Sequence, residues 1–338
     1  MDGESGGGTL RRAGGPRPGR RWPKVAVLVL VVLFLLVAAA VSATYLWAGT
    51  RLQQTDALAD YPGRPPRGKG TNWLIIGSDT RADLSRAQRE KLHVGGGGQR
   101  NTDTVMLLHY GDAGPYLVSL PRDSYVAVPG HGKGKLNAAY ARGGPKLLTR
   151  TVEQATGLRL DHYAEIDFLG FTHLVDALDG VRVCLRKPLR DTKAGADLPA
   201  GCRTLDGEEA LAFVRARYSD PEGDLGRVRR QRQLLSALVR EGTEAPVVAD
   251  PFRFYPFLGS ALDAVTVDRM SSVGSLTRMG WEIRGLTRGH GGTATVPVAN
   301  PGLSVPGAGS VVTWDPSGSR VLFDQLRQDV PITATAVK

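Results

Sequence analysis

One stretch of the sequence restricts the fold more than any other: residues 25–50, 26 in a row, carry no formal charge. A helix needs about 20 mostly apolar residues to cross the hydrocarbon core of a bilayer, so this stretch is long enough. Arginines precede it, and Trp22 and Trp47 lie near its ends, as in helices with a cytoplasmic N-terminus and interfacial aromatic anchors. We therefore expect a single-pass membrane protein whose transmembrane helix covers residues 25–48.

A cleaved signal peptide is the alternative interpretation of the same stretch. Val41, Ser42 and Ala43 resemble the small-residue site at which signal peptidase cuts. The apolar run, however, exceeds the 7 to 15 residues typical of a signal-peptide core, which favours a retained anchor. Under either interpretation the remainder of the chain is extracytoplasmic.

The charge distribution indicates the kind of partner. The chain has 43 Lys and Arg against 33 Asp and Glu, a formal net charge of +10. Residues 1–24 are rich in Gly, Arg and Pro and are expected to be a disordered basic cytoplasmic tail. Residues 49–70 are expected to be an extracytoplasmic stem, and residues 71–338 the folded domain. A basic surface outside the cytoplasm favours phosphates, anionic polymers or membrane lipid over nucleic acid.

The pattern of apolar runs and turn residues predicts an α/β fold. A buried strand at 73–76 is followed by strands at 104–110, 116–120 and 125–128, separated by Gly, Pro and Asp. Helices at 145–156 and 168–178 alternate with strands at 160–166 and 181–185. Helical spacing then extends from 206 to about 285. The last part of the chain contains strands at 294–298 and 310–314, followed by a helix at 319–328. This alternation is typical of a single layered α-β-α domain with a central mixed sheet, here preceded by one transmembrane helix.

The chain contains two cysteines, Cys184 and Cys202, 18 residues apart. An oxidising compartment favours a disulfide bond between two nearby cysteines, and two buried free thiols are the alternative. A metal site is disfavoured because no His or further Cys lies at ligand spacing from either residue.

Polar residues flank several predicted strands. Asp79 and Arg81 follow the first strand, Arg100 and Asp103 precede the second, and Arg122 and Asp123 follow the third. Sites in α/β folds form at the carboxyl ends of strands. Carboxylates at such an edge can hold Mg²⁺ against substrate phosphates, although each Asp can equally serve as a turn former.

A second group of basic residues lies between two predicted helices. Arg215 and Arg217 end one helix, an acidic loop with Pro and Gly intervenes, and the next helix places Arg227, Arg230 and Gln231 on one face. Arginine binds phosphate oxygens with two parallel hydrogen bonds and stays charged at every relevant pH. A solvated, salt-bridged helix surface is the alternative explanation of the same pattern.

Signatures of other enzyme classes are missing. Residues 71–338 contain no G-x-S-x-G, H-E-x-x-H or Walker A motif, and the glycines and lysines of residues 130–135 have the wrong spacing for a phosphate-binding loop. Its six histidines show no ligand pattern. A serine hydrolase and a zinc enzyme are therefore poorly supported.

With these segments in view, the domain resembles the LytR-CpsA-Psr family of cell-wall glycopolymer transferases, in its actinobacterial form. The resemblance covers about residues 72–330 and rests on ordered motifs: IIGSDTR, RNTDTVMLLH, VSLPRDSYV, KLNAAYARGG and LDGEEALAFVRARYSDPEGDLGRVRRQRQLL. It implies a Mg²⁺-dependent phosphotransferase of the EC 2.7.8 type. Such an enzyme moves a glycopolymer from an undecaprenyl-pyrophosphate carrier to a peptidoglycan acceptor through a phosphodiester bond.

The resemblance also implies roles for individual residues. Asp79 and Asp103 would hold Mg²⁺, and Asp79, Asp103, Arg122 and Arg217 would be the catalytic group. The residues expected to bind the pyrophosphate are Arg81, Arg100, Arg122, Lys135, Arg215, Arg217, Arg227 and Gln231. Asp224 would support them or, like Asp103, take a proton from the acceptor hydroxyl. The family has an apolar tunnel for the polyprenyl chain, whose lining the sequence does not assign.

Two other functions are compatible with the same residues. One is a scaffold that binds polyprenyl phosphates and anionic wall polymers without turnover. The other is a hydrolase of the same lipid-linked pyrophosphate, with water as the acceptor.

Overall fold

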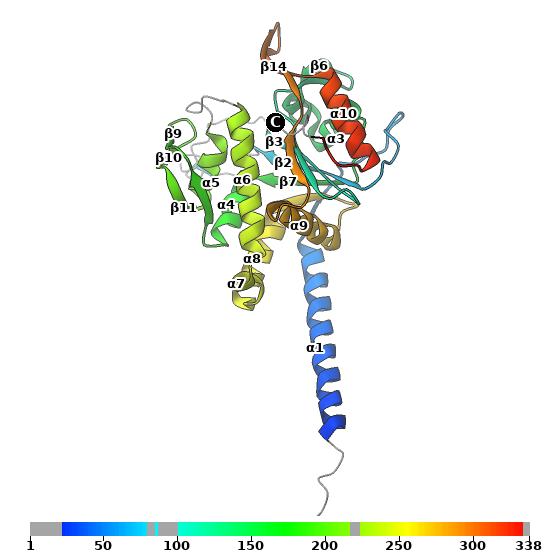
Figure 1. Ribbon diagram of the computed structural model, residues 1–338, viewed down its shortest axis with the longest axis vertical. Helices are drawn as coiled ribbons and strands as arrows, with labels where there is room; N and C mark the ends of the chain where they lie inside the picture. The colour runs from blue at the N-terminus through cyan, green and yellow to red at the C-terminus, as the bar shows by residue number, and fades with distance from the viewer. Residues whose placement is uncertain (1–21, 80–84, 87–100, 217–223, 334–338) are drawn as a thin grey trace, which may run out of the picture. The chain divides into compact units, whose positions relative to one another are not determined.

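The structure, a computed structural model, describes residues 22–79, 85–86, 101–216 and 224–333 (Figure 1). The chain divides into two compact units, residues 1–47 and 48–338. Most of helix α1 (Trp22–Arg51) belongs to the first unit. Within α1, 28 residues from Lys24 to Arg51 are long and apolar enough to cross a membrane. At 1.5 Å per residue they span roughly 42 Å, more than the hydrocarbon core of a bilayer.

The second unit is built on a seven-stranded mixed sheet with the order β1-β12-β7-β2-β3-β4-β13. Strands β2 and β7 are parallel, and β3 runs antiparallel to its neighbours β2 and β4. The strands are β1 (Gln53–Thr55), β2 (Thr71–Ser78), β3 (Thr102–Tyr110), β4 (Tyr116–Ser119), β7 (His162–Asp167), β12 (Val265–Asp268) and β13 (Gly292–Thr295). The central mixed sheet predicted from the sequence is thus confirmed.

Helices cover both faces of this sheet. Along β2, Trp73 and Ile75 point to one face, where they pack with α6 (Asp224–Gly242) and α9 (Val273–Thr287). Leu74 and Ile76 point to the other face, which α3 (Leu136–Thr156) and α10 (Pro316–Gln328) cover. Both rows are apolar because a strand buried on two faces has no solvent side. The α-β-α layering is confirmed (Figure 1).

A second apolar core lies beside the sheet, among helices and short β-ribbons. It contains α4 (Phe168–Asp176), α5 (Gly207–Arg215), α7 (Ala245–Val248), α8 (Pro251–Ala264) and the strands β8 (Val181–Leu185), β9 (Leu189–Asp191), β10 (Ala196–Leu198) and β11 (Gly201–Leu205). In the β8–β11 ribbon, Cys184 faces Cys202, and the two form a disulfide bond. The predicted disulfide is therefore confirmed.

The predicted stem contributes directly to this unit. Strand β1 pairs in parallel with β12, and Ala57 is fully buried in the main core. The buried carboxylate of Asp268 accepts hydrogen bonds from the amides of Ala57 and Leu58, at 3.0 and 2.9 Å. Residues 53–58 are therefore part of the folded domain, because their backbone groups find partners on β12.

Helix and strand boundaries differ from the sequence expectation in two further places. The helical spacing of residues 206–285 is interrupted by β12, whose Val265, Thr266 and Val267 form a β-branched run that pairs with β7. Helix α3 starts at Leu136 rather than at 145, but Gly143 and Gly144 break its helical backbone immediately before Pro145. The predicted helix start at 145 therefore corresponds to the second half of α3.

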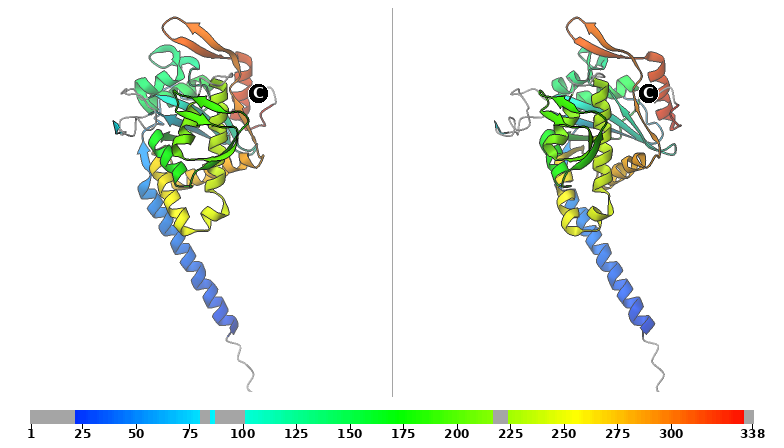
Figure 2. Two further views of the ribbon diagram at one scale, coloured as in Figure 1. Left: turned by 90° about the vertical axis from the view of Figure 1, so that its left-hand side faces the viewer. Right: turned by 60° about the vertical axis from the view of Figure 1, so that its left-hand side comes forward.

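Two antiparallel ribbons complete the unit. One consists of β5 (Tyr125–Val128) and β6 (Gly132–Lys135), and the other of β14 (Val298–Val305) and β15 (Gly309–Trp314). The β14–β15 hairpin projects from the rest of the folded unit (Figure 2). Trp314 at its base packs on Phe323 of α10 and donates a 2.9 Å hydrogen bond to Ser124 Oγ.

Candidate functional site

Strand polarity brings several predicted site residues to one edge of the sheet. Strands β2, β4 and β7 all end at the edge where β3 begins, because β3 is antiparallel to β2 and β4 and β7 is parallel to β2. Asp79 directly follows β2, Asp103 is the second residue of β3, Arg122 follows β4 by three residues, and Asp167 ends β7. This edge matches the carboxyl-end location expected of an α/β site.

A β-bulge positions Asp103. Gly77 pairs with Thr104 and Ser78 pairs with Thr102, so Asp103 is an extra residue on β3. Bulges redirect side chains at the ends of sheets and next to active sites. At the end of the neighbouring strand β2, the amide of Asp79 donates a 2.7 Å hydrogen bond to the carbonyl of Asn101. Asp79 itself is buried. The two carboxyl-bearing residues thus lie on adjacent strands at the same edge.

Arg122 connects Asp103 to a second charged group. Its guanidinium forms an ion pair with Asp103, and its Nε lies 3.7 Å from the carboxylate of Asp123. Lys135, the last residue of β6, contacts the same Asp123 carboxylate at 3.1 Å. The carbonyl of Arg122 also accepts a 2.9 Å hydrogen bond from the amide of Asn137 at the start of α3. Arg122 and Lys135 therefore lie in one charged network.

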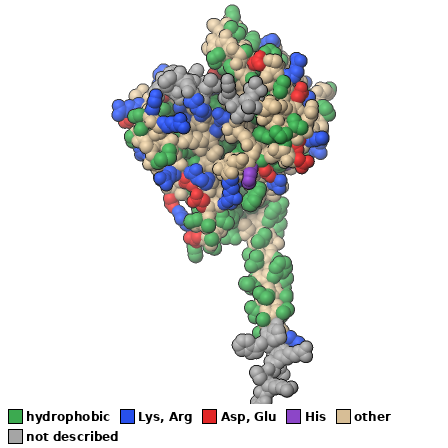
Figure 3. Space-filling view, viewed as in Figure 1, with side chains coloured by type: hydrophobic (Ala, Val, Ile, Leu, Met, Phe, Trp, Pro, Cys, Tyr) green, Lys and Arg blue, Asp and Glu red, His purple; other side chains and the backbone are tan. Residues whose placement is uncertain are grey.

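Helices α5 and α6 supply the other predicted residues. Arg215 ends α5, and its Cζ atom lies 5.3 Å from the centre of the Phe168 ring. Arg227 and Gln231, one turn apart on α6, are both buried. Lys and Arg side chains gather on the surface over α5 and α6 (Figure 3). The buried positions of Arg227 and Gln231 disfavour the interpretation of this face as an ordinary solvated helix surface.

Arg230 has a structural role that its place on the basic face did not suggest. Its guanidinium donates hydrogen bonds to the backbone carbonyls of Phe213 and Ala216. These carbonyls belong to the C-terminal end of α5, where backbone acceptors lack helical partners. Arg230 therefore holds the end of α5 against α6 and supports the position of Arg215.

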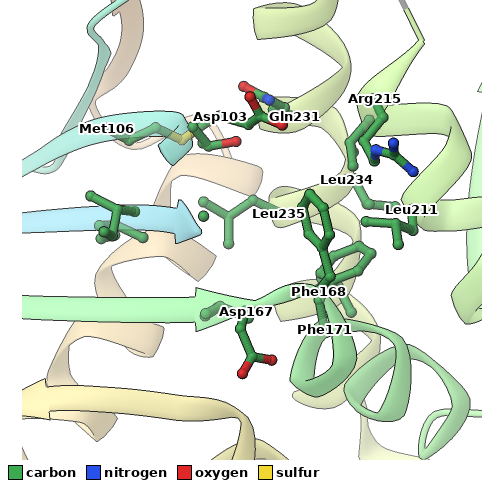
Figure 4. Close-up of a pocket in the computed structure, with 17 residues that line it drawn as sticks. Asp103, Met106, Asp167, Phe168, Phe171, Leu211, Arg215, Gln231, Leu234 and Leu235 are labelled. Carbon is green, nitrogen blue, oxygen red and sulfur yellow. The ribbon is translucent and has the colours of Figure 1, made fainter. Parts of the chain in front are cut away.

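The site continues into an apolar cavity. Asp103 and Gln231 lie side by side at one end of it, and Phe168, Phe171, Leu211, Leu234 and Leu235 form the wall beyond (Figure 4). The remaining lining residues are Ile75, Ile76, Gly77, Thr104, Met106, Ile166, Asp167, Val214, Arg215 and Leu238. Asp167 caps α4 by accepting a 2.7 Å hydrogen bond from the amide of Gly170. The cavity lining thus combines a few charged or amide side chains with a largely apolar wall.

The sequence did not identify the apolar residues of the cavity wall. Leu234, Leu235 and Leu238 recur at helical spacing, and this spacing is the feature of the sequence that points to them. It predicts an apolar helix face but does not distinguish a packed core from a cavity wall. Phe168 and Phe171 of α4 gave no separate signal.

Four predicted residues are not placed by the structure. Arg81, Arg100 and Arg217 lie outside the described residues. Asp224 is the first residue of α6, and its side chain is likewise outside the described set. Their roles stay predictions.

The structure places the two predicted Mg²⁺ ligands at one edge of the sheet. Over the described ranges, no group of three or more His, Cys, Asp or Glu side chains is arranged to hold a metal ion. Mg²⁺, however, keeps several waters and commonly takes only one or two protein carboxylates plus substrate phosphates. Asp79 and Asp103, from adjacent strands at one edge, match such a donor set.

The chain matches one protein family over most of its length. The model of the LytR_cpsA_psr family covers residues 50–310. The chain is 44% identical over 284 residues to the probable cell wall biosynthesis protein LcpB of Corynebacterium glutamicum, covering 83% of this chain and 66% of the relative. It is 30% identical over 299 residues to the cell wall biosynthesis protein LcpA of the same species, covering 75% of this chain and 55% of the relative. The chain therefore spans roughly half to two thirds of these relatives.

Solved structures share the fold. A LytR-Csp2A-Psr enzyme from Actinomyces oris superimposes with a TM-score of 0.65 at 21% identity, covering 82% of this chain and 96% of that one. TagT bound to LI-WTA superimposes with a TM-score of 0.58 at 24% identity, covering 82% and 96%. From the family match over residues 50–310, the chain belongs to the LytR-CpsA-Psr family.

Proposed function

We propose that this protein transfers a glycopolymer from an undecaprenyl-pyrophosphate carrier to peptidoglycan through a phosphodiester bond. The observation that carries the proposal is the combination of charged side chains with an apolar cavity. Asp103, Arg215 and Gln231 belong to the cavity lining, and Arg122 is ion-paired with Asp103. A lipid-linked pyrophosphate has the same two-part character, with an anionic head and an apolar tail.

The relatives support this substrate class. TagT, which shares the fold, has been solved bound to LI-WTA and LIIa-WTA, ligands named for wall teichoic acid. LcpB and LcpA are named for cell wall biosynthesis. We infer that this chain takes a lipid-linked wall polymer of comparable chemistry.

Arginine side chains would bind and stabilise the reacting phosphates. Arg122, Arg215 and Arg227, with Lys135 and Gln231, would donate hydrogen bonds to the pyrophosphate oxygens. Negative charge moves onto these oxygens and onto the departing lipid phosphate in the transition state, so fixed guanidinium groups stabilise it without reorganisation. By family resemblance, Arg81, Arg100 and Arg217 would complete this set.

The Asp103–Arg122 pair has a defined part in this scheme. Without substrate, the two side chains neutralise each other. A bound pyrophosphate would offer Arg122 a better acceptor, with more charge and more oxygens. Asp103 would then join Asp79 in holding Mg²⁺, which when bound supplies positive charge to the phosphate oxygens.

The covalent step is a phosphoryl transfer. A peptidoglycan hydroxyl oxygen forms a bond to the phosphorus that carries the polymer, and the bond from that phosphorus to the bridging pyrophosphate oxygen breaks. Undecaprenyl phosphate leaves with the bonding electrons. Asp103 or Asp224 would take the hydroxyl proton.

We also propose the membrane orientation inferred from the sequence, with the N-terminus cytoplasmic and the folded unit outside. The Cys184–Cys202 disulfide supports an oxidising location for that unit. The Arg-rich residues before α1 support a cytoplasmic N-terminus.

The test uses the purified full chain in detergent with a synthetic polyprenyl-pyrophosphate oligosaccharide, Mg²⁺ and a peptidoglycan fragment. Mass spectrometry should detect a phosphodiester-linked product that is lost in Asp79→Ala and in Arg215→Ala and on chelation of Mg²⁺. Arg190→Ala is the matched control, because Arg190 forms an exposed ion pair with Asp197 away from the cavity lining. A free phosphorylated polymer as the sole product would instead indicate a hydrolase, and binding without any product would indicate a scaffold.

A further inference from the structure

The corner between α7 and α8 carries a concentrated group of exposed apolar side chains. Val248 ends α7, and Phe252 and Tyr255 lie in the first half of α8, with 52%, 91% and 42% of their surfaces exposed. Among the described residues after α1, no other eight-residue segment contains three large exposed hydrophobic residues. Apolar patches of this kind mark contact surfaces rather than ordinary solvent-facing helix.

Two charged residues of the corner have partners within the protein. The Asp250 carboxylate caps α8 by accepting a 2.9 Å hydrogen bond from the amide of Phe252. The guanidinium of Arg253 pairs with Asp179 at 2.6 Å. The corner therefore presents exposed apolar side chains next to a helix-capping carboxylate and an intramolecular ion pair. Hydrophobic side chains are visible at this lower end of the folded unit, over α7 and α8 (Figure 3).

The far end of α8 is fastened to the point at which the chain leaves the apolar helix α1. Arg51, the last residue of α1, forms a 3.2 Å ion pair with Asp263 in the last turn of α8. Gln53 Nε2 donates a 3.2 Å hydrogen bond to the carbonyl of Asp263. Strand β12 follows α8 directly and pairs with β1. The position of α8 is thus fixed relative to Arg51.

From this arrangement we propose that the α7–α8 corner is a second membrane contact, which docks into the head-group region of the bilayer that α1 spans. Phe252 lies eleven residues before Asp263, roughly 16 Å along the helix. A chain whose Arg51 is held at the membrane surface therefore keeps Phe252 within reach of that surface. Aromatic rings favour the interface between lipid and water. This inference rests on the proposed membrane anchoring and not on the transfer reaction.

Docking of α8 would also fix the cavity relative to the bilayer. A Cβ atom added at Gly170 of α4 would lie 2.7 Å from the Cα atom of Ala264, so the two helices are in close backbone contact. Helix α4 carries Phe168 and Phe171 of the cavity wall. A membrane contact at α8 would therefore hold this wall close to the lipid surface, where a lipid-linked substrate resides.

The test places nitroxide labels on the full chain in nanodiscs of phosphatidylcholine and phosphatidylglycerol. The only native cysteines form a disulfide, so Phe252→Cys and the control Val321→Cys can be labelled selectively without reductant. Val321 is also exposed, but it lies on α10, in the helical layer that α10 forms with α3 on one face of the sheet. We expect the label at 252 to be reached by oxygen and shielded from an aqueous nickel chelate, and the label at 321 to show the reverse.

A second variant tests the role of the ring itself. With the label at Val248→Cys, adding Phe252→Ser should lower the ratio of oxygen to nickel accessibility, because the polar Ser side chain gains no free energy from the apolar part of the interface. Equal aqueous accessibility at 252 and 321, or no effect of Phe252→Ser, would overturn the proposal. Dipolar coupling between labels at 252 would also overturn it, because a second copy would then be the partner. If the label at 252 is shielded from nickel in a protein that shows no transferase activity, the membrane contact is supported and only the proposed function is contradicted.

Discussion

The carboxylate of Asp103 is ion-paired with the guanidinium of Arg122, although the residues are 19 positions apart, Asp103 in β3 and Arg122 in the connection after β4. A bulge in β3 directs Asp103, and the chain leaving β4 brings Arg122 to the same edge. The pair joins the two kinds of group that a phosphotransferase site needs, a metal-binding carboxylate and a phosphate-binding guanidinium.

Removing either side chain of this pair should abolish most of the transfer activity. We expect Arg122→Ala to reduce kcat by about 10² to 10³, the usual loss when one fixed donor to a developing charge is removed. Arg122→Lys should recover only part of this loss because ammonium lacks the planar fork. The double variant with Asp103→Ala should lose less than the product of the two single losses, since the side chains act as a unit. Steady-state rates with the lipid-linked substrate check this, and strictly multiplicative losses would contradict it.

Filling the cavity should make activity depend on lipid length. Val214→Trp adds bulk to a partly buried residue of the wall. We expect KM for a long polyprenyl substrate to rise at least about tenfold, while a short-chain analogue is affected less, because only the long chain needs the deeper cavity. Val321→Trp on α10 is the control. Equal effects of Val214→Trp on both lipids would show that the cavity does not hold the tail.

Breaking the disulfide should destabilise the folded unit without removing a site residue. Closing an 18-residue loop stabilises a protein by about 3 kcal/mol in the chain-entropy model. The double variant Cys184→Ser, Cys202→Ser should therefore unfold at lower denaturant concentration, and dithiothreitol should affect the parent but not the variant. The β8–β11 ribbon is also held to α6 by a 3.2 Å hydrogen bond from Gln233 to the carbonyl of Cys184. The variant should therefore retain transfer activity at low temperature. Complete loss of activity there would contradict the claim that the disulfide contributes only stability.

Asp329 should contribute stability that depends on pH. Burial raises the pKa of its carboxyl, but hydrogen bonds from the amides of Asp112 and Ala113 and from His109 outweigh this and lower the pKa overall. A carboxyl with a lowered folded-state pKa stabilises the protein above its unfolded pKa of 3.8, and this stabilisation is lost as the pH falls through the folded value. Asp329→Asn should therefore be less stable than the parent near neutral pH, and the difference should shrink in acid. Denaturant unfolding at several pH values measures this, and a constant difference would contradict it.

The contact of Gly170 with Ala264 should tolerate no side chain. Gly170→Ala places a methyl group against backbone and should cost about 1 to 3 kcal/mol. Gly280→Ala on α9 is the matched control, because a Cβ atom there meets nothing within 4 Å and alanine favours the helix by up to about 1 kcal/mol. Thermal unfolding of both variants compares them. Equal melting temperatures would show that α4 and α8 separate easily.

The sequence by itself determined the features that depend on local pattern. The uncharged apolar run predicts α1, the alternation of short apolar runs with helical spacing predicts the layered α-β-α domain, and two cysteines in an exported domain predict the disulfide. Each of these follows from length, periodicity or composition within one segment. The polar residues at strand ends, with the family resemblance, also identified Asp79, Asp103 and Arg122 as site candidates.

Only the tertiary structure decided what depends on contacts between distant segments. Strand β12 lies within a stretch of helical spacing, and β1 lies in the predicted stem, because pairing with each other and with β7 outweighs their weak local signals. The bulge at Asp103, the capping of α5 by Arg230 and the cavity between α4, α5 and α6 likewise have no local signature. Whether a leucine on α6 fills a core or lines a cavity is set by what the facing helices leave open, and periodicity records only which side of the helix it occupies.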